Sequence, residues 1–267
     1  MKKVLVFVLV LVLALTAFAG CGQKNDKEIV VGASVAPHAE ILKQCASYIE
    51  SKGYTLKIVE FSDYIQPNIS LEDGSLDANY FQHLPYLESF SSDHNYTDLV
   101  SVLKVHFEPL GIYKGTKGDT LANLKAGDKI AVPDDETNCA RALQLLAAQK
   151  IITITNDKGL KTTVKDIDSK GLEIIPLEAS AIAVQLPELA FAVINGNYAV
   201  DFGLQDKVVA QEESTSLAAS TYANILVCKE KDKDSDKIKV LIDALKQDSV
   251  KDYITNTYGG LVVPFEA

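Results

Sequence analysis

Hydrophobic positions along the chain alternate between short apolar runs and a helical spacing. Residues 37–53 place Ile41, Leu42, Cys45 and Ile49 on one face, and Gly53 follows as a stop signal, which predicts a helix. Short apolar runs bounded by polar or turn residues predict strands. These runs occupy residues 28–34, 54–61, 76–81 and 99–107. Strands that alternate with helices predict an α/β protein with mostly parallel sheets.

A second set of strand signals begins after residue 119. The segment 108–114 continues the strand of residues 99–107 past a proline and a glycine, and residues 234–258 form an amphipathic helical tail. Two sets of α/β elements in about 240 residues predict two lobes. The strands of the second set are a run that ends at Pro133 and the segments 171–178, 189–196 and 221–229.

The N-terminus has the pattern of a secretory signal. Lys2 and Lys3 precede an uncharged apolar run over residues 4–19, which is shorter than the roughly 20 residues that span a membrane. Small residues then precede Cys21, in a pattern similar to a bacterial lipobox. We expect residues 1–20 to be removed, Cys21 to carry the lipid, and residues 21–28 to form a tether. An ordinary secreted protein or an uncut anchor are the alternatives.

Charge and motifs narrow the function classes. The formal net charge is −10 and no basic run is present, which argues against nucleic-acid binding. Neither G-x-S-x-G nor H-E-x-x-H occurs, so nothing favours a hydrolase or a cofactor enzyme. Cys45, Cys139 and Cys228 form no C-x-x-C pair, and we expect them to be buried free thiols.

Arg141 is the only arginine in a chain that otherwise uses lysine. If Asn138 caps the helix that follows, Arg141 lies in its first turn, where a cation opposes the helix dipole unless an anion binds there. The planar guanidinium takes a carboxylate through two hydrogen bonds. The residue therefore indicates a carboxylate-binding site, and a surface ion pair with Asp134, Asp135 or Glu136 is the alternative.

Aromatic and amide side chains gather at other predicted strand ends. Tyr64, Phe81 and His83 suit a ligand with an apolar body and a polar tip, although a core cluster would look similar. Asn195 and Asn224 offer both donors and acceptors, although an Asn-Gly turn explains the first equally well.

Five segments together resemble a known family. They are DYIQPN, LDANYFQHLPYL, PDDETNCARAL, AVINGNYA and YANILV, and they occur in this order. The chain is similar over residues 28–264 to the NlpA family of methionine-binding lipoproteins, which feed ABC importers. The resemblance implies a periplasmic-binding-protein-like (type II) clamp, with residues 29–110 and 224–267 in one lobe and 111–223 in the other.

The resemblance also implies roles for the candidate residues. Arg141 and Asn138 match binders of the amino-acid carboxylate, Asn195 and Asn224 match head-group ligands, and Tyr64, Phe81 and His83 match the side-chain pocket. The expected ligand is L-methionine or a close relative, with no metal or other cofactor. We expect a lipid-anchored, palmitate-bearing extracytoplasmic monomer whose partners are the ABC permease, its ATPase subunit and the membrane.

Two related alternatives remain open. A methionyl-dipeptide-binding protein would use a similar site. A metal-importer lipoprotein would gather histidines on Zn²⁺, for which the candidates are His38, His83, His94 and His106.

Overall fold

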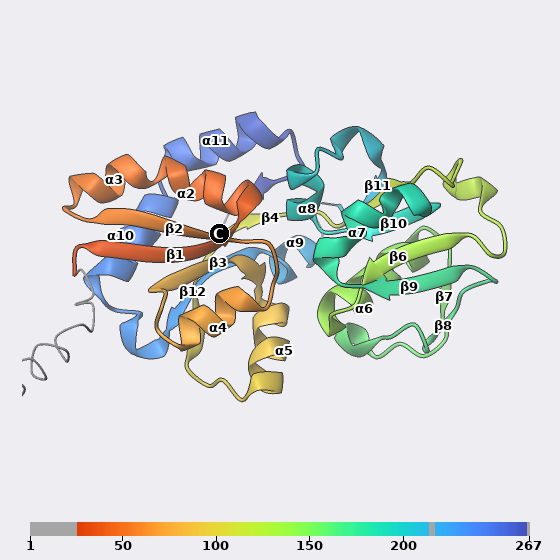
Figure 1. The fold of residues 1–267 in the computed structure, drawn as a ribbon, viewed down its shortest axis with the longest axis horizontal. Helices are drawn as coiled ribbons and strands as arrows, with labels where there is room; N and C mark the ends of the chain where they lie inside the picture. The colour runs from red at the N-terminus through yellow and green to blue at the C-terminus, as the bar shows by residue number, and fades with distance from the viewer. Residues whose placement is uncertain (1–25, 214–216, 266–267) are drawn as a thin grey trace, which may run out of the picture.

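The computed structural model describes residues 26–213 and 217–265. The predicted signal and Cys21 therefore lie outside the described residues. Within those ranges, no helix is long and apolar enough to cross a membrane. Two α/β lobes lie side by side, each with its own sheet (Figure 1). This confirms the two-lobed α/β prediction.

The first lobe contains a six-stranded sheet. Strand β1 lies between β2 and β3 and pairs with both in parallel, in register from Glu28↔Thr55 and Val31↔Ala78. The other pairings are antiparallel. The strands, in order across the sheet, are β13 (Val263–Pro264), β4 (Leu99–Phe107), β12 (Asn224–Lys229), β3 (Ala78–His83), β1 (Glu28–Ser34) and β2 (Thr55–Phe61).

Helices cover both faces of this sheet. On one face Ile41 and Ile49 pack with Ile238 and Ile254, which are all fully buried or nearly so. Leu71 and Leu87 cover the other face against Ile225. The helices are η1 (Val35–Ala39), α2 (Glu40–Gln44), α3 (Ala46–Ser51), α4 (Gln66–Glu72), α5 (Leu84–His94), η6 (Glu230–Asp232), α10 (Asp236–Leu245) and α11 (Asp248–Tyr258).

The second lobe contains a five-stranded sheet. Strands β10, β6 and β9 run parallel, with β9 at the edge, whereas β5 and β11 pair antiparallel at the other side. In order the strands are β11 (Val208–Gln211), β5 (Gly111–Lys114), β10 (Phe191–Ile194), β6 (Lys129–Pro133) and β9 (Glu173–Leu177). A separate pair consists of β7 (Thr153–Ile154) and β8 (Ile167–Asp168).

Helices also sandwich the second sheet. Leu143 and Leu146 pack on Ile130 and Phe191 from one face, and Ile182 packs on Ala192 from the other. The helices are η2 (Leu121–Asn123), α6 (Glu136–Ala148), η3 (Gly159–Lys161), α7 (Ala179–Gln185), η4 (Leu186–Glu188), α8 (Gly196–Asp201), η5 (Gln205–Lys207) and α9 (Leu217–Thr221), the last of which leads back toward the first lobe.

Both sheets are mixed, so the expectation of mostly parallel sheets is wrong: parallel pairing is confined to the βαβ units, and the other pairs are antiparallel. The antiparallel strands β5 and β12 are those that the chain enters directly after it passes between the lobes. The predicted continuation of the strand of residues 99–107 is therefore wrong: the chain leaves the first sheet after Phe107 and β5 belongs to the second. The lobe boundaries after residues 110 and 223 stay a prediction. The assignment of β5 to the second sheet and of β12 to the first supports it.

Two predicted helices are subdivided. The helix of residues 37–53 is present as η1, α2 and α3, which are separated at Cys45, and Gly53 ends it with φ +81°. The tail forms two helices because Gln247 adopts an extended conformation between α10 and α11. Cys45, Cys139 and Cys228 are buried free thiols, as predicted.

Candidate functional site

The start of α6 differs from the prediction. The N-cap is Asp135, whose side chain accepts a hydrogen bond from the Asn138 backbone N–H at 3.0 Å. Asn138 is therefore inside the helix and its side chain is available for other contacts. Arg141 is the sixth helical residue, so the expected anion site at the first turn is wrong in its placement.

Arg141 instead extends into the space between the lobes. Its Nε and Nη2 donate to the Glu212 carboxylate at 2.8 and 2.5 Å, and Nη2 also donates to the Glu108 carbonyl at 3.0 Å. The guanidinium lies over the Tyr222 ring at 4.3 Å from its centroid. Nη1 makes no hydrogen bond within the described part of the chain, so this arm of the guanidinium is available to a ligand.

The candidate residues from both lobes meet at one cavity. The cavity has about 20 Å³ of space for the centres of water-sized molecules, so its walls lie close together. All seven residues singled out from the sequence line it: Tyr64, Phe81, His83, Asn138, Arg141, Asn195 and Asn224. The other lining residues, which are not among the predicted ligands, are Gln82, Tyr86, Glu108, Gly196 and Asn197.

Asn138 organises the polar wall of the cavity. Its Nδ2 donates to Asp135, and its Oδ1 lies 3.1 Å from His83 Nε2 and 3.0 Å from Asn195 Nδ2. His83 Nδ1 accepts the Tyr86 backbone N–H, which leaves the proton on Nε2 for Asn138. These bonds orient Asn195 so that its Oδ1 is buried without a hydrogen-bond partner.

An aromatic wall stands opposite this amide network. The Tyr64 ring centroid lies 5.9 Å from Phe81, 5.7 Å from Tyr86 and 5.1 Å from Tyr198. The Tyr64 hydroxyl donates to Asn197 Oδ1 at 2.5 Å, and the Tyr86 hydroxyl donates to the Tyr64 carbonyl. Because the hydroxyls of Tyr64 and Tyr86 are engaged, these two rings and Phe81 add largely apolar surface to the cavity lining.

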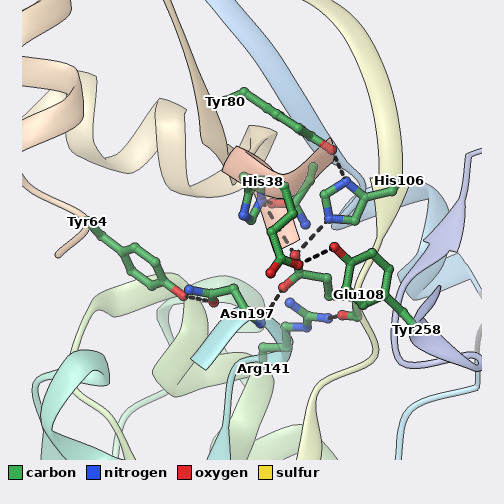
Figure 2. Close-up of polar contacts among 10 residues, drawn as sticks. His38, Tyr64, Tyr80, His106, Glu108, Arg141, Asn197 and Tyr258 are labelled. Carbon is green, nitrogen blue, oxygen red and sulfur yellow. Dashed lines mark hydrogen bonds and ion pairs between the residues drawn. The ribbon is translucent and has the colours of Figure 1, made fainter. Parts of the chain in front are cut away.

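Glu108, which the sequence analysis missed, lies between the two lobes. It follows β4 directly, so its position at a strand end was the signal that could have found it. Its Oε1 accepts from His106 Nε2 at 2.7 Å, and its Oε2 accepts from the Asn197 backbone N–H at 2.7 Å. Tyr80 bonds the other nitrogen of His106, so a chain of hydrogen bonds reaches from the first lobe to the second (Figure 2).

The four histidines do not converge. His38 and His106 lie near Glu108, with their candidate ligand atoms within 4.8 Å of one another, but His83 is on the amide wall and His94 stacks on Phe90. Because the facing nitrogens of His38 and His106 are engaged by Asn224 and Glu108, hydrogen bonding accounts for this cluster. The alternative in which the four histidines converge with a carboxylate on Zn²⁺ is therefore wrong, because of the four only His38 and His106 come together beside Glu108.

Burial keeps His38, His83 and His106 neutral. It lowers the pKa of His38 to about 4 and that of His106 to about 3. For His83, burial and then the charge of Arg141 lower the pKa to about 3. Burial raises the pKa of the Glu108 carboxyl, and His38, the Asn197 N–H and Arg141 oppose that shift.

These shifts predict a pH dependence of stability. An unfolded histidine binds a proton below about pH 6.5, whereas native His83 does not, so the free energy of unfolding falls as pH falls from about 6.5 toward 3. The free energy of unfolding can be measured by urea titration at several pH values near 5. Plotted against pH, it should rise more steeply for the wild type than for His83→Gln, by about 1.4 kcal/mol per pH unit. Above about pH 7.5 the two slopes should agree. Equal slopes near pH 5 would contradict the assignment of His83 as neutral.

The cavity combines three features. Its lining includes a guanidinium arm, buried amide and carboxylate oxygens, and aromatic rings. Such a site is complementary to a small molecule with a carboxylate, a hydrogen-bond donor and an apolar chain. Two α/β lobes around a cavity of this kind define a two-lobed substrate-binding protein.

Comparison with known proteins gives the family. The profile of the NlpA lipoprotein family matches residues 29–266, and the chain belongs to that family. It is 39% identical to the methionine-binding lipoprotein MetQ of Bacillus subtilis (strain 168), over 99% of both chains.

Solved structures agree. A lipoprotein structure from Ruminococcus gnavus ATCC 29149 is 48% identical, with a TM-score of 0.86 over 90% of this chain and 100% of that one. A nutrient-binding protein from Burkholderia cenocepacia, solved bound to methionine, is 36% identical, with a TM-score of 0.82 over 89% of this chain and 100% of that one.

Proposed function

We propose that this protein is the lipid-anchored, extracytoplasmic component of an ABC importer and that it captures L-methionine between its lobes. The observation that carries the proposal is the convergence of a lone guanidinium and an aromatic wall on one cavity. Family membership and the methionine-bound relative support the choice of ligand.

The binding mode follows from the groups that line the cavity. The ligand carboxylate pairs with the free arm of Arg141, whose other donors are held by Glu212 and the Glu108 carbonyl. Asn195 and Asn224 contact the head group. The thioether packs against Phe81 and Tyr64, where sulfur–ring contacts each contribute about 0.3–1.5 kcal/mol.

Closure of the lobes would complete the site. Contacts between the lobes are already present: Tyr64 donates to Asn197, Tyr198 donates to the Ser62 carbonyl at 3.1 Å, and His83 pairs with Asn138. A ligand that contacts both walls binds the closed form more tightly than the open one and therefore shifts the population toward it. The closed, loaded form is the state that the permease would receive.

Anchoring is the other part of the proposal. Lipidation of Cys21 would hold the protein near its permease and ATPase partners, and several acyl chains anchor far better than one. The segment between Cys21 and β1 would act as the tether, which ends before Glu28 because that residue already belongs to β1. We also propose that the protein works as a monomer, since the seven candidate ligand residues converge within a single chain.

Calorimetric titration of L-methionine tests the function. The protein should start at Gly22 and be unfolded and refolded beforehand, so that any ligand carried through purification is removed. We expect tight one-to-one binding of L-methionine. Binding of a methionyl dipeptide or Zn²⁺ in its place, with no heat from any form of methionine, would overturn the proposal.

A further inference from the structure

The side chain of Glu108 is an unassigned charged group in the cavity wall. Glu108 is 6% exposed and directs its carboxylate between Asn197 and the two histidines of the first lobe (Figure 2). A buried carboxylate is costly unless hydrogen bonds or a cation compensate it. The protein supplies hydrogen-bond donors to both oxygens but no direct cationic partner within the described residues.

The neighbouring groups orient this carboxylate. Tyr80 bonds His106 Nδ1, which leaves the proton of the imidazole on Nε2, where it is donated to Glu108 Oε1. Asn224 Oδ1 fixes the proton of His38 on Nε2, which also lies 3.5 Å from Glu108 Oε1. Both rings therefore act as neutral donors, so neither histidine brings a positive charge to the Glu108 carboxyl.

The cavity offers few other acceptors to a ligand. Asn138 Oδ1 faces two donors, Asn224 Oδ1 faces His38, and Gln82 Oε1 accepts from Asn68. What remains is the Glu108 carboxylate and the buried, unpartnered Asn195 Oδ1. Arg141 is already paired with Glu212, so the Glu108 charge is not neutralised by the cation that serves the ligand carboxylate.

The backbone beside Glu108 is adapted to its close approach. A Cβ added at Gly196 would lie 2.7 Å from Glu108 Cβ and 3.0 Å from Oε2. Only glycine at this position lets the second lobe close onto Glu108 so that the Asn197 N–H reaches the carboxylate. Gly196 also lines the cavity, so the same close approach brings Glu108 to the ligand space.

We propose that Glu108 is the counter-ion of the ligand's α-ammonium group and selects zwitterionic amino acids over carboxylic acids of the same shape. The inference rests on the proposed function. Asn195 Oδ1 would accept a second ammonium hydrogen. Arg141 would then bind the carboxylate of the amino acid, and Glu108 would bind its ammonium group.

The test compares two ligands that differ only in the ammonium group. L-Methionine and 4-(methylsulfanyl)butanoate are titrated into the wild type and Glu108→Gln. We expect the wild type to prefer L-methionine by at least about 100-fold, the scale of a buried charge pair. Glu108→Gln should weaken L-methionine by a similar factor but change 4-(methylsulfanyl)butanoate by less than about 3-fold.

A structural role for Glu108 predicts a different result. If the residue only holds the lobes together, the substitution weakens both ligands by the same factor, which overturns the inference. Equal affinity of the wild type for both ligands overturns it without any variant. Failure of the wild type to bind L-methionine instead overturns the proposed function.

Two further variants serve as controls in case Glu108→Gln does not fold. Glu108→Asp retains the charge on a shorter side chain, and we expect an intermediate loss of preference for L-methionine. Asp201→Asn removes an exposed carboxylate elsewhere on the second lobe and should leave the ratio of the two affinities unchanged. If Glu108→Gln does not fold, an unchanged ratio in Glu108→Asp overturns the inference.

Discussion

Replacing Arg141 with alanine should weaken L-methionine binding at least about 100-fold. Truncating one partner of a buried, hydrogen-bonded charge pair costs about 2–5 kcal/mol, and about 2.7 kcal/mol corresponds to a factor of 100. Arg141 is 4% exposed and contacts Glu212, Glu108 and Tyr222, so its loss also leaves the Glu212 carboxylate without its cation. Calorimetric titration beside the wild type measures the change.

Arg141→Lys separates charge from geometry. A lysine ammonium cannot reproduce the planar fork that holds Glu212 through Nε and Nη2 while Nη1 reaches the ligand. We expect this variant to remain at least about 10-fold weaker than the wild type. Wild-type affinity in Arg141→Ala would show that the ligand carboxylate binds elsewhere.

Loss of the Phe81 ring should weaken L-methionine binding by about 30- to 100-fold. The ring belongs to a buried cluster with Tyr86 and Phe90 and lines the cavity, where it would cover the ligand thioether. Full burial of the methionine side chain of the ligand contributes about 1.5–3 kcal/mol, and sulfur–ring contacts add to that. Calorimetric titration of L-methionine into Phe81→Ala and the wild type measures the loss of affinity.

Phe90 supplies a matched control. It is buried in the same cluster and stacks on His94, but it does not line the cavity. Phe90→Ala should lower the stability to a similar extent and leave the affinity within about 3-fold of the wild type. Equal losses of affinity in the two variants would mean that the aromatic wall acts only through folding.

Much of the fold was visible in the apolar runs. Residues 99–107 form β4 over the whole predicted length, and the runs near Pro133 and residues 171–178 became β6 and β9. Such runs report burial on both faces of a sheet, so they locate strands well. They do not report which sheet a strand joins, which is why β5 was assigned to the preceding strand.

The candidate site was predictable in its residue types but not in its geometry. Asp135 and Asn138 are both good N-caps, and sequence alone could not tell which one begins α6. The partner of Arg141 is Glu212, 71 residues away, whereas the sequence pointed to the neighbouring acids. Glu108 gave little signal because a single carboxylate after a strand resembles any surface residue until the lobes are assembled.

A crystal structure of the refolded protein loaded with L-methionine tests the account most directly. The measured quantities are the distances from the ligand carboxylate to Arg141 Nη1 and from the ligand nitrogen to Glu108. The account predicts both within hydrogen-bond range, about 2.7–3.2 Å, with the thioether on Phe81. Methionine bound outside this cavity, or bound with its carboxylate away from Arg141, would contradict it.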